Sequence, residues 1–154
     1  MRTIFILLML LPTLLSAQIK VDDVGDGWKS RVDSAIQLIQ KVSPDAWALL
    51  DSTTNKVEFW LGDRSSTRPD PAFGKGTILL AVDDIELGVF NVAAVLVHES
   101  LHLSFHQKKL QLETKQEELT AYLWELLFLM QVPGCPFWLI HNAEYQIKTI
   151  YSNK

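Results

Sequence analysis

Cysteine is almost absent from this sequence, because Cys135 is the only one among 154 residues. A disulfide within the chain and a zinc site built from several thiolates are therefore excluded. An excess of positive charge is absent too, since 14 Lys and Arg residues stand against 18 Asp and Glu residues and give a net charge of −4. A domain that binds nucleic acid is expected to have a basic surface, so we expect no nucleic acid partner.

Long apolar segments are scarce, and the N-terminus has the composition of a targeting segment. Arg2 precedes the apolar run Ile4–Leu11, and Leu15-Ser16-Ala17 follows with small residues at its end. This order is typical of an export signal. The run is also interrupted by Pro12 and is shorter than the about 20 residues that cross a bilayer. We therefore predict a signal peptide at residues 1–17, cleavage after Ala17, a secreted or periplasmic protein, and no membrane span in the mature chain.

Proline and glycine are missing from residues 89–132, and this region contains the sequence His98-Glu99-Ser100-Leu101-His102. Histidines four residues apart lie on one face of a helix, so their imidazoles can take two corners of a tetrahedral zinc site. Glu99 leaves such a helix about 100° away from His98 and can reach a water at the metal without binding the metal. Chance produces this motif in roughly one chain of this length in a few hundred, so a third ligand is needed to support a metal site.

The rest of the chain has the periodicity of an α+β protein. Composition and length predict one domain, residues 18–154, that is mostly helical with a small antiparallel sheet next to the helix of the two histidines. A turn is expected at residues 53–55 and a long polar loop at residues 62–76. The predicted helices span residues 28–42, 44–50, 88–106, 114–131 and 136–151, and the predicted strands lie at residues 57–61 and 77–82.

The predicted helix over residues 114–131 offers a third ligand. If it packs antiparallel to the histidine helix, a carboxylate in its first turns completes a site of two His and one Glu. Glu118 is the expected ligand, because it shares a face with Ala121, and a small residue there lets the two helices approach closely. Glu117 lies about 100° away and is the alternative. Acidic residues in a first turn are also favoured by the helix dipole alone.

The motif His98-Glu-x-x-His102, followed by Glu118-x-x-Ala121-Tyr122, resembles the compact zinc metallopeptidases of the gluzincin type, over roughly residues 75–125. The resemblance implies a zincin-like domain in which His98, His102 and Glu118 bind Zn²⁺ and Glu99 is the general base. It also implies that the strand at residues 77–82 lines the substrate cleft. Larger gluzincins have an Asp where this chain has Tyr122, so the groups that orient the histidines must come from elsewhere.

Other histidine ligands are not expected. The metzincin motif continues with a glycine and a third histidine, whereas this chain has Phe105 and Lys108 at those positions. His106 lies about 12 Å along the helix from His98 and cannot join both other histidines on one ion. His141 is expected at the surface.

These observations predict a zinc-dependent hydrolase of peptide bonds outside the cytoplasm, with a peptide or protein substrate. Two alternatives remain open at the level of the sequence. One is a secreted zinc-binding module without catalytic activity, which has no need for Glu99. The other is a helical interaction protein without metal, in which the histidines are incidental.

Overall fold

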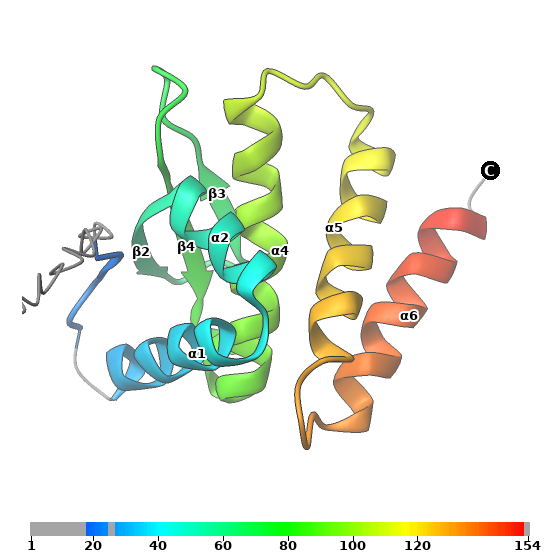
Figure 1. The fold of residues 1–154 in the computed structure, drawn as a ribbon, viewed down its shortest axis with the longest axis horizontal. Coiled ribbons are helices and arrows are strands. Elements are labelled where there is room, and N and C mark those ends of the chain that lie inside the picture. The colour runs from blue at the N-terminus through cyan, green and yellow to red at the C-terminus, as the bar shows by residue number, and fades with distance from the viewer. Residues whose placement is uncertain (1–17, 25–26, 153–154) are drawn as a thin grey trace, which may run out of the picture.

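The structure is a computed structural model that describes residues 18–24 and 27–152. The predicted signal peptide at residues 1–17 therefore lies outside the described residues. The described chain is one α+β domain, as predicted, in which the small sheet and the helices of the N-terminal half lie on one side of a central helix and the C-terminal helices lie on the other (Figure 1).

The first half of the domain contains β1 (Lys20–Val21), α1 (Trp28–Val42), α2 (Pro44–Thr53) and β2 (Thr54–Trp60). Ser43 separates the two helices, because its side chain accepts a hydrogen bond from the amide of Ala46 and Pro44 occupies the first turn of α2. The predicted turn at residues 53–55 is wrong. Instead α2 continues through Thr53, because the backbone amide of Thr54 still donates to the carbonyl oxygen of Leu50, and β2 begins directly at Thr54.

The sheet also contains β3 (Ser66–Arg68) and β4 (Gly76–Ala81), and its strand order is β1-β2-β4-β3. The β1–β2 and β2–β4 pairings are parallel, and only the β3–β4 pairing of the described strands is antiparallel. The predicted antiparallel sheet is therefore a mixed sheet. The segment expected as a loop, residues 62–76, explains the difference. It contains β3, which pairs antiparallel with one edge of β4. The other edge of β4 pairs with β2, and this pairing is parallel.

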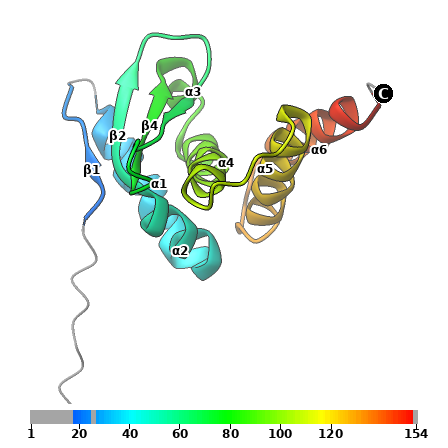
Figure 2. The same ribbon diagram turned by 90° about the horizontal axis from the view of Figure 1, so that it is seen from above.

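The second half of the domain contains α3 (Val82–Glu86), α4 (Val89–Gln107), α5 (Thr114–Leu129) and α6 (Phe137–Ser152). Seen from above, α4 lies between the sheet and α5, and α6 lies beyond α5 (Figure 2). Gly88 precedes α4 with a φ of 100°, a conformation that residues with a Cβ rarely adopt, and so permits the tight connection between α3 and α4.

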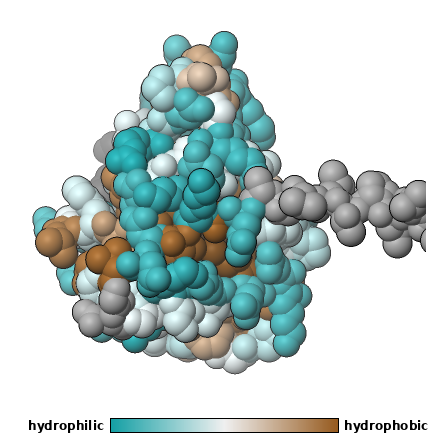
Figure 3. Space-filling model, turned by 90° about the vertical axis from the view of Figure 1, so that its left-hand side faces the viewer, coloured by the Kyte–Doolittle hydropathy of each residue, from teal (hydrophilic) through white to brown (hydrophobic). Residues whose placement is uncertain are grey.

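Apolar packing around α4 holds the domain together. The main core contains fully buried side chains from both sides of α4, among them Ile39, Ile78, Leu96 and Phe128. On the face at the left of Figure 1, hydrophobic residues lie between hydrophilic ones (Figure 3). Within the described part of the chain, no helix is both long enough and apolar enough to cross a membrane.

Candidate metal centre

The two histidines of α4 point to the same place. His98 and His102 are one helical turn apart, and their Nε2 atoms are separated by 3.2 Å. Their ring centroids are 5.1 Å apart, with the ring planes tilted by 55°. The spacing in the sequence therefore produces the convergence that it predicts.

Glu118 of α5 joins this pair. Its Oε2 atom lies 3.6 Å from His98 Nε2, and its Oε1 atom lies 3.4 Å from His102 Nε2. The three side chains each offer one ligand atom, and these atoms all lie within 4.8 Å of one another. Ligands at zinc bond lengths of about 2.0–2.1 Å in a tetrahedron are separated by about 3.3 Å, so these distances fit a metal ion held between the three groups.

Close contact between α4 and α5 brings Glu118 into place. Ala121, one turn after Glu118, is completely buried and packs with Leu101 and Phe105 of α4. Trp124 covers the edge of this small cluster. The small side chain at position 121 thus allows the approach of the helices that the sequence analysis expected.

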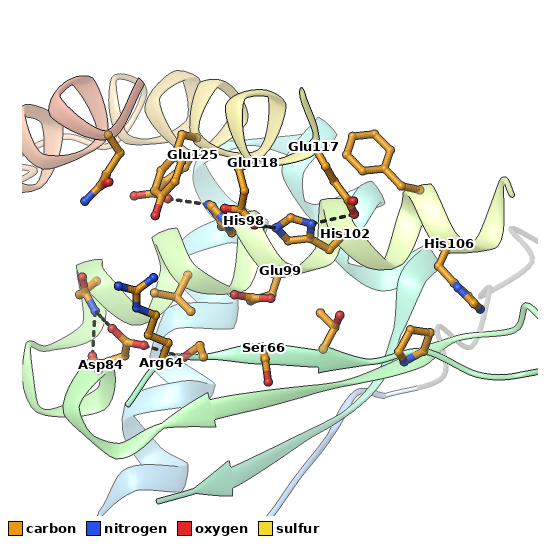
Figure 4. Close-up of a pocket in the computed structure, with 18 of the residues that line it drawn as sticks. Arg64, Ser66, Asp84, His98, Glu99, His102, His106, Glu117, Glu118 and Glu125 are labelled. Carbon is orange, nitrogen blue, oxygen red and sulfur yellow. Dashed lines mark hydrogen bonds and ion pairs between the residues drawn. The ribbon is translucent and has the colours of Figure 1, made fainter. Parts of the chain in front are cut away.

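The other nitrogen of each histidine meets a second carboxylate of α5. Nδ1 of His98 donates to Glu125 Oε2 at 3.0 Å, and Nδ1 of His102 donates to Glu117 Oε1 at 3.0 Å (Figure 4). Glu117, the alternative ligand, thus binds the nitrogen of His102 that faces away from the cluster. A neutral imidazole that donates through Nδ1 has its lone pair on Nε2. Both lone pairs then point at the place that Glu118 also faces, which is the arrangement of a cation site.

The motif alone predicts that groups other than residue 122 orient the histidines, but it identifies no residue for that role. Glu125 follows Glu118 by two helical turns and so lies on the same face of α5. The helical repeat alone therefore predicts that Glu125 faces the histidines. The role of Glu117 depends on the rotation of α5 against α4, which the repeat alone does not fix.

The carboxylates around His98 set its charge. Burial lowers the pKa of this imidazole, but its interactions with the carboxylates of Glu118 and Glu125 outweigh burial and raise the pKa to about 9. The interaction with His98 in turn holds the pKa of Glu118 below its usual range. A positive charge is thus favoured between these groups, either as a proton on His98 or as a bound cation.

Glu99 is buried beside the cluster without joining it. Its carboxylate lies between α4 and β3 (Figure 4), and 8% of the residue is exposed. Burial raises the pKa of Glu99, although the charges of His98 and His102 oppose the rise. Among the described residues, none donates a hydrogen bond to this carboxylate. It is therefore available to a water or a substrate in the cavity.

Tyr122 contacts the same histidine from α5. Its ring meets the His98 ring edge-on, with centroids 4.5 Å apart. Burial, together with the negative charges of Glu125 and Glu118, raises the pKa of Tyr122 to about 12. The phenol therefore keeps its proton at neutral pH and can donate a hydrogen bond into the cavity.

The site opens into a cavity of about 780 Å³ between α4, α5 and the segment that contains β3. Ser66, Thr67 and Pro69 line it, whereas no residue of β4 does. The expectation that the strand at residues 77–82 lines the cleft is thus wrong. That strand is β4, which is paired on both sides and largely buried, and β3 forms the edge beside the site.

The other histidines lie outside the cluster, as predicted. His106 Nε2 lies 3.1 Å from the carbonyl oxygen of Asp70, and its ring stacks on Phe73. His141 is exposed on α6 and stacks on Phe137.

Comparison with models of known families, with curated proteins and with solved structures finds no match.

Proposed function

We propose that this protein is a zinc-dependent peptidase that acts outside the cytoplasm. One observation carries the proposal: the Nε2 atoms of His98 and His102 converge with the Glu118 carboxylate, directly beside the buried Glu99. The extracellular or periplasmic location rests on the sequence of residues 1–17.

The donor set suits zinc better than other common metals. Two imidazole nitrogens and one carboxylate oxygen are typical of catalytic zinc sites, whereas calcium and magnesium favour oxygen ligands throughout. Three protein ligands leave a fourth position for water. When bound, zinc lowers the pKa of that water to about 7 and polarises the carbonyl group of a substrate.

The proposed role of Glu99 is that of the general base. Its carboxylate receives a proton from the attacking water and delivers it to the amine that leaves when the peptide bond breaks. A raised pKa suits this exchange, because a group that both takes and returns a proton works best when its pKa is near the working pH. Tyr122 has a protonated phenol and can donate a hydrogen bond to the oxygen that gains negative charge.

The shape of the cavity supports a peptide substrate. β3 is an edge strand, so the main-chain groups on its outer side are not paired within the sheet. An extended peptide can pair with such an edge, and its main chain then runs past the metal site. Ser66 and Thr67 of β3 line the cavity, which supports binding of the peptide along β3.

Glu99→Gln tests the proposal. The amide has the size of the carboxylate but cannot take up a proton, so we expect zinc binding to persist and hydrolysis of a peptide library to fall about 10²- to 10⁴-fold. Metal content is measured by atomic emission and cleavage by mass spectrometry. Glu113→Gln, at an exposed position before α5, is the control and should retain activity. Full activity of the zinc-loaded Glu99→Gln protein would overturn the mechanism.

The second candidate is a zinc-binding module without catalytic activity. It is favoured by the carboxylates on both outer histidine nitrogens, because such a network also suits a metal that joins two helices. Under this alternative the wild-type protein contains stoichiometric zinc but leaves every peptide of the library intact. A gently purified protein without stoichiometric metal would instead favour the metal-free interaction protein.

A further inference from the structure

One cation faces the cavity beside the metal centre. Among the cavity-lining residues, Arg64 is the only Lys or Arg, whereas six residues carry a carboxylate. It belongs to the segment between β2 and β3. Its side chain points from that segment towards α4 on the side of Glu99 and His98 (Figure 4). These acidic residues are Asp63, Asp84, Glu99, Glu117, Glu118 and Glu125.

The backbone on both sides of Arg64 is fixed. The indole Nε1 of Trp60 donates to the carbonyl oxygen of Arg64 at 2.9 Å. The next residue, Ser65, donates its hydroxyl to Asp84 Oδ2 at 2.6 Å and accepts a hydrogen bond from the amide of Ala81 at 2.9 Å. These contacts attach the segment to β4 and α3 and so fix the backbone position of Arg64.

Arg64 and three of the cavity's carboxylates differ in their contacts within the protein. Glu117 and Glu125 accept hydrogen bonds from the histidines, and Asp84 accepts one from Ser65. Arg64 is exposed and lines the cavity. Within the described residues, its guanidinium group forms no ion pair with a carboxylate. It is nevertheless close enough for its charge to favour the ionised form of Glu118.

We propose that Arg64 binds a carboxylate of the substrate beside the scissile bond and so selects acidic peptides. The inference rests on the proposed peptidase function. A guanidinium group presents two parallel N–H donors that match a carboxylate, and such a charge-assisted pair is strong and specific. The surrounding carboxylates increase this selectivity, because they repel a substrate carboxylate at every position in the cavity that Arg64 does not reach.

The carboxylate has two chemical sources, which the experiment separates. An acidic side chain next to the cleaved bond makes the protein an endopeptidase for acidic sites. A free C-terminus makes it a carboxypeptidase. Two pairs of peptides distinguish the sources. In the first pair both peptides have an amidated C-terminus, and one has Glu and the other Gln beside the cleaved bond. In the second pair one peptide has a free C-terminus and the other an amidated C-terminus.

The test compares kcat/KM of the zinc-loaded wild type and three variants on these peptides. We expect the wild type to prefer the acidic member of one pair about ten- to hundredfold, as a charged hydrogen-bonded pair implies. Arg64→Gln should abolish the preference and Arg64→Lys should retain a part of it, since the bidentate geometry is lost. Arg68→Gln removes a guanidinium group that pairs with Glu58 and does not line the cavity, and should leave the preference intact. Equal cleavage within both pairs by the wild type, or an unchanged preference in Arg64→Gln, would overturn the proposal.

A binding measurement separates this inference from the peptidase function. Calorimetry with the zinc-loaded Glu99→Gln protein, alone and combined with Arg64→Gln, reports affinity for the same peptides without turnover. A preference in binding that Arg64→Gln removes would support the role of Arg64 even if the wild type cleaves none of the peptides, and in that case only the peptidase function fails. Equal affinity within both pairs would overturn the role of Arg64, whatever the activity.

Discussion

The two ends of the α4–α5 pair are held together in different ways. At the end where α4 begins and α5 ends, Leu96, Phe128 and Leu129 belong to the main core and are fully buried. At the other end, the apolar contact is a small cluster around Ala121, and polar contacts of the two histidines with the glutamates accompany it. The first end depends on burial of apolar surface, which needs no ligand. The second depends on groups whose charge and partners change with protonation and metal binding.

The largest effect is expected from Phe128→Ala at the apolar end. Removing this ring leaves a cavity among fully buried side chains and should lower the free energy of unfolding by about 3–5 kcal/mol. Leu101→Ala, in the small cluster at the other end, should cost less, roughly 2 kcal/mol. Urea denaturation followed by circular dichroism measures both, and equal losses would show that the two ends do not differ in this way.

Zinc should stabilise the site end selectively. At a free zinc concentration 100 times its Kd, the free energy of unfolding should rise by about 2.7 kcal/mol. The amide exchange of residues 98–106 and 114–122 should slow more than that of residues 128–139, because the proposed ligands His98, His102 and Glu118 would bridge the helices only at the site end. Hydrogen exchange with mass spectrometry measures this difference. Equal slowing in both regions would contradict it.

A smaller effect is expected from the carboxylates that orient the histidines. Glu125→Gln should weaken zinc affinity about 10- to 100-fold, because the amide is a poorer acceptor for the Nδ1 proton of His98. Glu117→Gln should weaken it less, since its side chain is 30% exposed against 9% for Glu125. Competition with a chromogenic chelator gives both affinities. Leu123→Gln, on the exposed side of α5, is the control and should leave zinc affinity unchanged.

The sequence predicted those parts of the molecule that depend on local pattern. The bounds of α1 are Trp28 and Val42, as expected, and α4 to α6 begin and end within about two residues of the predictions. The spacing of the two histidines and the position of Glu118 on its helix face follow from the same helical repeat. These features can be predicted because each depends only on residues that are close together in the sequence.

The parts that the sequence did not predict depend on partners far away in the chain. β3 has three residues and lies within the predicted loop, because no alternation of apolar residues marks so short a strand. Its pairing with β4 made the sheet mixed and placed β3, instead of the strand at residues 77–82, beside the cavity. Arg64 was missed for the same reason, since its position follows from the contacts of Trp60 and Ser65.

The division of the site between two helices also sets an order of events during protein synthesis. α4 carries both histidines and Glu99, whereas α5 carries Glu117, Glu118 and Glu125. A ribosome therefore completes the histidine pair before any of the α5 carboxylates has been added to the chain. A nascent chain that ends before Glu118 has two imidazoles without their acidic partners, so under the proposed function firm binding of zinc must wait until α5 has been made and has folded against α4.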